Sequence, residues 1–259
     1  MRPLDGLLFD VDGTLAETEE LHRQAFNQAF SERGLDWHWE RDLYRDLLRV
    51  AGGRERIRHY LQRFHPEALA DPDIDRLIRE LHARKTAIYT ERVARGDLPL
   101  RPGVARLLEE ARAAGLRLGI ATTSSPENVE ALLRANLGAD ALGWFTAIVA
   151  GDSVPRKKPA PDVYLRALEA LGLSSQAALA FEDSDNGVRA ARGAGLPVLV
   201  TVSDYTRGQD FSGADLVVDS LGAPGRPVRI LSGQAPPTER IDLPFLREWF
   251  SRLPPEARR

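Results

Sequence analysis

The sequence predicts an α/β fold in which a doubly wound parallel sheet carries an inserted α-helical domain. Two observations predict it. Between residues 102 and 218, short apolar runs alternate with amphipathic stretches, the pattern of a parallel sheet covered by helices on both faces. Between residues 17 and 94, apolar residues instead recur at spacings of three and four, and no convincing strand interrupts them.

The elements follow from these patterns in chain order. Residues 4–12, LDGLLFDVD, are predicted as a buried strand that ends in carboxylates, and a Gly-Thr turn follows. The helical block then begins near residue 17, with further helices expected at 40–50, 54–64 and 73–94. The alternating part predicts strands at 116–122, 145–150, 177–181, 197–202 and 215–218, with helices at 102–114, 126–136, 160–171 and 186–194.

This order divides the chain into three parts. We expect an α/β core from residues 1–15 and 96–222, and a helical domain from residues 16–95 between them. The remainder, 223–259, is richer in proline and glycine. Its amphipathic piece at 243–253 predicts one short docked helix.

Composition excludes several classes of protein. The net charge of −3 disfavours a general nucleic-acid binder, which usually carries a basic excess. The absence of cysteine excludes disulfides, thiolate nucleophiles and cysteine metal sites. No apolar run approaches the roughly 20 residues of a membrane span, and the N-terminus lacks the pattern of a signal peptide. We therefore expect a cytoplasmic protein with neither a nucleic-acid nor a membrane partner.

Two carboxylates follow the first predicted strand, Asp10 and Asp12 in the segment DVDGT. In open parallel sheets, ligands bind beyond the carboxyl ends of the strands, and alternation places both side chains on one side. Carboxylates this close repel each other unless a cation lies between them or one is protonated. A Mg²⁺ at Asp10 and a proton on Asp12 would both serve phosphate chemistry. The alternative is an ordinary Asx turn.

A second acidic pair, Glu182 and Asp183, directly follows the predicted strand at 177–181. Its structural alternative is an N-cap for the helix at 186–194. Because both acidic pairs follow strands of one sheet, they can meet at one edge, where uncompensated carboxylates would be costly. Together they predict an oxygen-ligand site for a hard cation.

Two further signals lie beyond strands of the same sheet. Thr122, Thr123 and Ser124 close the strand at 116–122, and hydroxyls followed by helix N–H groups suit a phosphate. Lys158 lies in a loop before a helix that begins with proline, where an ammonium can balance nucleophile and phosphate charge. Ordinary capping and an exposed loop lysine are the respective alternatives.

With these four signals in chain order, the sequence resembles the haloacid dehalogenase-like hydrolase superfamily. The motifs that carry the resemblance are DVDGT, ATTS, the KKPAPD lysine and EDS, within about residues 4–222. The resemblance implies a Rossmann-like core and an α-helical cap placed after the first strand. The aspartate two residues after Asp10 favours phosphate esters, since dehalogenases and phosphonatases of the superfamily lack it.

The resemblance also implies a role for each motif residue. Asp10 would be the nucleophile that forms an aspartyl-phosphate, and Asp12 the general acid and then the general base. Thr122, with Ser124, would hold a phosphoryl oxygen, and Lys158 would link nucleophile and phosphate. The implied Mg²⁺ ligands are Asp10, the backbone carbonyl of Asp12, Asp183 and Glu182.

The helical block is expected to select the substrate. Paired glycines followed by arginines suit a distal anion, because bare backbone then lies beside guanidinium groups. Surface helix positions and a plain helix–helix turn are the alternatives. The candidate substrate ligands in this block are Glu19, His22, Gly52, Gly53, Arg54, Arg56 and Lys85.

The strings TEELH, GGRER, ATTS and EDSDNGVRAA are similar to the CbbY-type subfamily, whose known activity is hydrolysis of xylulose 1,5-bisphosphate. The resemblance implies that Glu19 and His22 contact sugar hydroxyls, and that Arg54, Arg56 and Lys85 contact the distal phosphate. The expected partner is a small phosphorylated sugar, and the expected assembly a monomer or weak dimer.

Three other functions remain open at this point. A β-phosphoglucomutase uses the same core and cap, and motifs do not reveal the lifetime of its aspartyl-phosphate. A phosphoglycolate phosphatase would need fewer cap cations than this chain provides. A non-catalytic phospho-receiver-like switch also uses acidic strand ends and a lysine, but receivers are roughly one small domain without an inserted cap.

Overall fold

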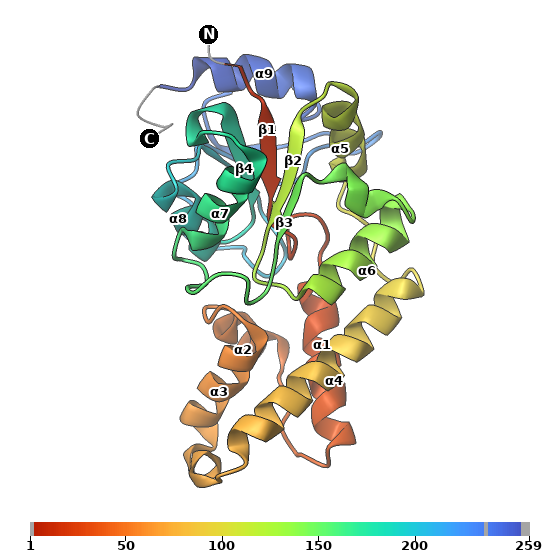
Figure 1. The fold of residues 1–259 in the computed structure, drawn as a ribbon, viewed down its shortest axis with the longest axis vertical. Helices are drawn as coiled ribbons and strands as arrows, with labels where there is room; N and C mark the ends of the chain where they lie inside the picture. Colours follow the sequence, from red (N-terminus) through yellow and green to blue (C-terminus); the bar gives the residue numbers. More distant parts are fainter. Residues whose placement is uncertain (1–2, 236–237, 255–259) are drawn as a thin grey trace.

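The computed structural model describes residues 3–235 and 238–254, and its helices lie on both faces of one sheet and beyond one end of it (Figure 1). The strand order is β3-β2-β1-β4-β5-β6-β7, with the first six strands parallel and β7 antiparallel to β6. The strands are β1 Gly6–Phe9, β2 Arg117–Ala121, β3 Ala147–Val149, β4 Ala178–Glu182, β5 Val198–Thr201, β6 Leu216–Val218 and β7 Ile230–Gly233.

The register of the central strands brings their carboxyl ends to one level. Phe9 of β1 is paired with Ile120 of β2 on one side and with Phe181 of β4 on the other. The rings of Phe9 and Phe181 stack with centroids 4.5 Å apart. The residues that follow these positions therefore emerge side by side at one edge of the sheet.

Two apolar clusters hold helices against the sheet. Alternation along β1 sends Leu7 and Phe9 into one cluster and Leu8 into the other. The first cluster includes side chains of α5 Val104–Ala113, α6 Pro126–Leu137 and α9 Leu243–Arg252; the second includes those of α7 Asp162–Leu171 and α8 Asp185–Gly193. The sheet is covered on both faces, as the sequence predicts.

The inserted helices form a group of their own beyond the carboxyl end of the sheet (Figure 1). Their aromatic core includes Phe26, Trp39 and Tyr44, all fully buried. Leu21 and Tyr89 instead belong to the cluster on the sheet, so the inserted helices also pack against the α/β part of the chain. Its elements are α1 Glu19–Glu32, α2 Arg41–Leu47, α3 Gly53–Phe64, the 3-10 helix Pro66–Ala70 and α4 Ile74–Ala94.

The structure differs from the sequence-based expectations at several places, of which three bear on the arrangement of the sheet and the cap. The first strand ends at Phe9 rather than residue 12, because the chain turns at Gly13, whose φ is +81°. The second cap helix ends at Leu47 rather than residue 50, ahead of Gly52 with φ +92°. The antiparallel strand β7 was not predicted, since its four residues are exposed and carry no buried apolar pattern. The division into three domains stays a prediction.

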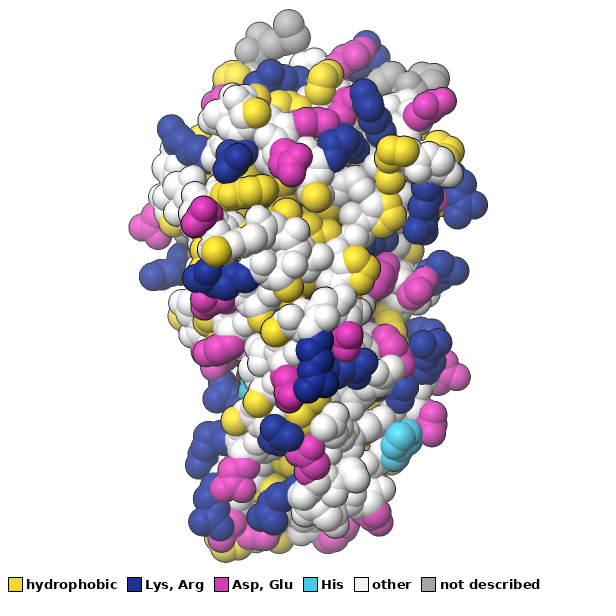
Figure 2. Space-filling model, turned by 90° about the vertical axis from the view of Figure 1, so that its right-hand side faces the viewer, with side chains coloured by type: hydrophobic (Ala, Val, Ile, Leu, Met, Phe, Trp, Pro, Cys, Tyr) yellow, Lys and Arg dark blue, Asp and Glu magenta, His cyan; other side chains and the backbone are white. Residues whose placement is uncertain are grey.

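Charged side chains of both signs are interspersed over the face shown in Figure 2, and hydrophobic side chains show mainly over the half that carries the sheet. Among the described residues, no helix combines the length and apolar character that crossing a membrane requires.

Candidate active site

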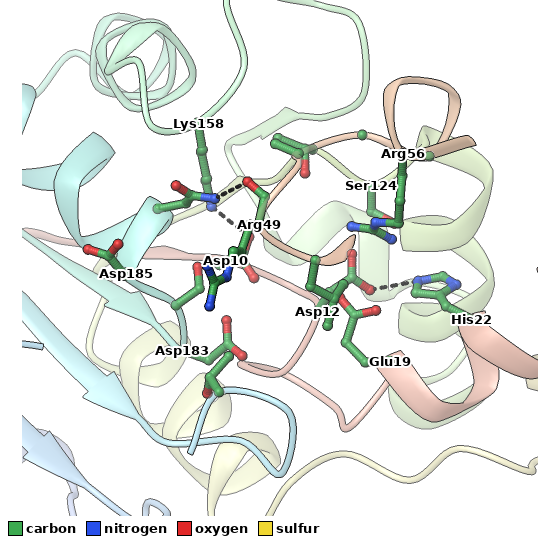
Figure 3. Close-up of a pocket in the computed structure, with 18 of the residues that line it drawn as sticks. Asp10, Asp12, Glu19, His22, Arg49, Arg56, Ser124, Lys158, Asp183 and Asp185 are labelled. Atoms are coloured by element: carbon green, nitrogen blue, oxygen red, sulfur yellow. Dashed lines mark hydrogen bonds and ion pairs between the residues drawn. The ribbon is translucent and has the colours of Figure 1, made fainter. Parts of the chain in front are cut away.

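Asp10, Lys158 and Asp183 converge on one side of a cavity at the carboxyl edge of the sheet (Figure 3). Asp10 directly follows β1, and its backbone N–H donates to the carbonyl of Phe181 at 3.0 Å. Lys158 comes from the loop before α7, and its Nζ lies 2.6 Å from Asp10 Oδ1 and 2.5 Å from Glu182 Oε1. The order of the strands thus joins motifs more than 140 residues apart in the chain.

Three buried carboxylates meet at this edge. Oxygen atoms of Asp10, Glu182 and Asp183 lie within 4.8 Å of one another. Burial raises the pKa of Asp10, with Lys158 opposing the shift and Glu182 adding to it. Burial also raises the pKa of Asp183, and the nearby carboxylates add to that shift. One ammonium does not balance three carboxylates, so an all-oxygen donor set with excess negative charge fits a divalent cation such as Mg²⁺.

Asp12 faces the cap rather than this cluster (Figure 3). Its Oδ1 accepts a hydrogen bond from Thr18 Oγ1 at 2.6 Å and lies 3.0 Å from His22 Nε2. Burial alone would raise the pKa of Asp12, but His22 and Thr18 hold it below its usual range. Burial lowers the pKa of His22, which suits a neutral imidazole that donates from Nε2. Both aspartates line the cavity, but the prediction that their side chains lie on one side is wrong, because Thr18 and His22 turn Asp12 toward the cap.

The cavity has a volume of about 490 Å³ and its cap wall is cationic. Lys85 is buried, with its Nζ 5.1 Å from the ring centroid of Phe26. Burial lowers the pKa of Lys85 to about 8; Asp12 opposes this shift and Arg56 adds to it. Two further cap cations, Arg49 and Arg56, also line the cavity. An acidic sheet edge therefore faces a basic cap across one cavity.

Arg56 also organises the loop before the paired glycines. It donates to the carbonyls of Leu47 and Val50, each at 3.3 Å, and to the hydroxyl of Tyr44 at 3.1 Å. The Tyr44 hydroxyl in turn donates to Glu19 at 2.7 Å. Two of the cap ligands expected from the sequence, Glu19 and Arg56, are thus connected through Tyr44.

Most sequence-predicted residues line this cavity, but three do not. Thr122 is buried behind it, and its Oγ1 accepts from the Ser124 N–H at 3.1 Å. Glu182 is fully buried behind Lys158. Arg54 pairs instead with Asp152 of the core. The predicted residues that do line it are Asp10, Asp12, Glu19, His22, Gly52, Gly53, Arg56, Lys85, Thr123, Ser124, Lys158 and Asp183.

Sequence reasoning missed several lining residues. Arg49 lines the cavity and lies three positions before the paired glycines. Its closeness to that motif is the signal in the sequence that could have identified it. Asn186 follows the second acidic pair, and its side chain donates to the carbonyl of Arg49 at 3.1 Å across the core–cap boundary. Further unpredicted lining residues are His82, Asn128, Asp185, Arg189, Gln209 and Asp210.

Comparison with known proteins agrees with this site. Residues 4–195 match the family model of haloacid dehalogenase-like hydrolases. The plasmid protein CbbY of Cupriavidus necator is 52% identical over 247 residues, which cover 95% of this chain and 96% of that one. CbbY of Rhodobacter capsulatus is 54% identical over 220 residues, covering 85% and 95%.

A solved structure is similar over most of its length. It is a mutant of CbbY from Rhodobacter sphaeroides in complex with xylulose-(1,5)-bisphosphate, 48% identical, with a TM-score of 0.79 over 86% of this chain and 98% of that one. The chain thus matches these proteins over nearly their whole length. The matched region includes the acidic strand ends, the lysine and the helical cap. The chain belongs to the haloacid dehalogenase-like hydrolase family, in its CbbY branch, and is a phosphatase.

Proposed function

We propose that this phosphatase hydrolyses a sugar bisphosphate with Mg²⁺, and that its substrate is xylulose 1,5-bisphosphate, which it converts to xylulose 5-phosphate and phosphate. One observation carries the proposal: a single cavity is lined both by an acidic edge that can bind a cation and by several cations from the cap. A ligand with a phosphate at each end matches that arrangement. The similarity to a CbbY structure that contains this bisphosphate supports the choice of sugar.

The reacting phosphate belongs at the sheet edge. Asp10 attacks phosphorus, forming an aspartyl-phosphate, while the leaving sugar oxygen takes a proton from Asp12. Water then attacks the aspartyl-phosphate and gives a proton to Asp12, which releases phosphate and restores Asp10. The hydrogen bonds from Thr18 and His22 orient Asp12 and stabilise its carboxylate, the form that accepts the proton of the attacking water. Asp12 therefore has to take up a proton before it can donate one to the sugar oxygen.

The charge of the transferred group is balanced by nearby residues. Lys158 contacts Asp10 and so lies beside the phosphoryl oxygens. Thr123 and Ser124 provide hydroxyls at the cavity wall, with Thr122 supporting their turn. Asp10, Asp183, Glu182 and the backbone carbonyl of Asp12 would hold Mg²⁺, which when bound supplies charge stabilisation for phosphoryl transfer.

The distal phosphate belongs at the cap wall. The cap cations Arg49, Arg56 and Lys85 all line the cavity, as do Gly52 and Gly53. Glu19 and His22 also line the cavity and suit the sugar hydroxyls. The sequence also pointed to Arg54 for this task, but its pairing with Asp152 favours a contribution to cap position.

The test is phosphate release from a panel that contains xylulose 1,5-bisphosphate, xylulose 5-phosphate, phosphoglycolate and β-glucose 1-phosphate with its bisphosphate activator. We expect the highest kcat/KM for xylulose 1,5-bisphosphate. Asp10→Asn should lower kcat at least about a thousandfold, or about 4 kcal/mol, because it removes the nucleophile. Asp10→Asn should still show the unfolding transition of the unaltered protein, because the substitution leaves the fold intact.

Two outcomes would contradict the proposal. Isomerisation of β-glucose 1-phosphate without net phosphate release would identify a mutase. Turnover by Asp10→Asn above that limit would show that another group attacks phosphorus.

A further inference from the structure

Glu182 is fully buried, and its two carboxylate oxygens have different partners. Oε1 accepts from Lys158 Nζ at 2.5 Å and from the Tyr164 hydroxyl at 2.6 Å. Oε2 accepts from the backbone N–H of Asp183 at 3.2 Å. Because a carboxylate oxygen accepts roughly two hydrogen bonds, Oε1 is filled and Oε2 retains one acceptor position.

Close packing also restricts the position of the Glu182 carboxylate. A Cβ at Gly187, in the first turn of α8, would overlap the Glu182 carboxylate, so the backbone of that helix lies directly against it. The carboxylate has little room to move sideways. Its rotation is then set by the donors at Oε1 and Oε2.

Tyr164 touches both members of the buried ion pair. It lies on α7, six residues after Lys158, and is fully buried. Its hydroxyl donates to Glu182, and its ring centroid lies 5.1 Å from Lys158 Nζ. A phenylalanine would fill the same apolar cluster, so packing alone does not account for the hydroxyl.

We propose that Tyr164 is a positioning residue that assigns the two Glu182 oxygens to different cations. Its hydroxyl holds Oε1 on the side of Lys158, which leaves Oε2 as the oxygen that would hold a divalent ion together with Asp183. Tyr164 itself touches neither the phosphate nor the ion. This inference rests on the proposed function in one respect, that a divalent ion is the cofactor.

The experiment measures Mg²⁺ binding by calorimetry without substrate. Tyr164→Phe keeps the ring in the core and removes only the hydroxyl, so the chain should fold. We expect its Kd for Mg²⁺ to rise about tenfold, and its kcat for p-nitrophenyl phosphate at saturating Mg²⁺ to fall by about as much, with little change in KM. Removing a residue that hydrogen-bonds to a metal ligand commonly lowers metal affinity or activity by a factor of this size.

The matched control is Tyr60→Phe. The Tyr60 hydroxyl lies 3.2 Å from His65 Nε2 within the cap, so this change also removes a hydrogen-bonded tyrosine hydroxyl. Both variants should lose a little thermal stability, but Tyr60→Phe should bind Mg²⁺ as the unaltered protein does. If Tyr164→Phe also binds Mg²⁺ normally, whatever its melting temperature, Tyr164 is only a packing residue.

The two proposals fail separately. An unaltered protein that binds Mg²⁺ and hydrolyses p-nitrophenyl phosphate, but not xylulose 1,5-bisphosphate, would overturn the proposed substrate and leave this test intact. Equal Mg²⁺ affinity in Tyr164→Phe and the unaltered protein would overturn the proposed role of Tyr164. It would not contradict the proposed hydrolysis of the sugar bisphosphate.

Discussion

Lys85 is a buried cation whose charge depends on pH near neutrality. It faces Asp12, Glu19 and Arg56, and the rings of Phe26 and Tyr89 lie about its ammonium. Burial lowers its pKa to about 8, so it is charged below that pH and neutral above it. If it binds the distal phosphate, its charge is required for capture of a bisphosphate.

We therefore predict that kcat/KM for xylulose 1,5-bisphosphate falls as pH rises through about 8. A charge-assisted hydrogen bond is worth about 1.5–3 kcal/mol, so the fall should be about tenfold or more. Steady-state kinetics between pH 6.5 and about 9.5 would measure it.

Lys85→Arg provides the control, because arginine stays charged over this range. Its profile for the bisphosphate should be flat near pH 8. The unaltered protein should also show no such fall with p-nitrophenyl phosphate, which has no second phosphate. A fall of the same size in Lys85→Arg would assign the titration to a different group.

Charged side chains join cap helix α3 to the core. Arg54 pairs with Asp152, and Lys157 lies 2.7 Å from Glu55 and 3.1 Å from Asp152. These side chains lie outside the acidic edge of the cavity. Their interaction holds the cap against the core, so its loss affects every substrate in the same way.

We predict that Arg54→Ala raises KM for xylulose 1,5-bisphosphate and for p-nitrophenyl phosphate by similar factors. Ion pairs this exposed contribute about 0.2–1 kcal/mol, so the increase should be less than about fivefold. Asp152→Ala should act through the same contact, and the double variant should show less than the sum of both effects.

Arg58→Ala is the matched control, because Arg58 pairs with Asp75 and both lie in the cap. It should leave both KM values unchanged. A large increase confined to the bisphosphate in Arg54→Ala would instead show that Arg54 contacts the distal phosphate, the role the sequence first suggested.

The sequence was sufficient for the elements that carry periodic or motif signals. The strand before Asp10 and the cap helix at 73–94 have strong apolar patterns, and their positions were predicted to within a few residues. The position of Arg54 could not be predicted in this way. A guanidinium beside paired glycines pairs with whichever partner the fold brings near, and Asp152 lies 98 residues away in the chain. Strand β7 has no buried residue to reveal it.

At the scale of the whole molecule, the C-terminal part closes the hydrophobic core at the end opposite the cap. In Figure 1, α9 lies across the end of the sheet where β1 begins. Trp249 and Phe250 of this helix are almost fully buried in the cluster shared with α5 and α6. The Trp249 Nε1–H donates to the carbonyl of Gln234 at 3.1 Å, which ties the helix to the segment after β7.

Because α9 lies far from the cavity, it should affect stability without affecting catalysis. We predict that Trp249→Ala lowers the free energy of unfolding by about 3–5 kcal/mol, the usual cost of removing a buried aromatic side chain. The folded fraction should keep its kcat/KM. Leu165→Ala, at a side chain that is 48% exposed, should change stability by less than about 0.5 kcal/mol in the same denaturant titration. A loss below about 1 kcal/mol for Trp249→Ala would show that the helix does not complete the core in solution.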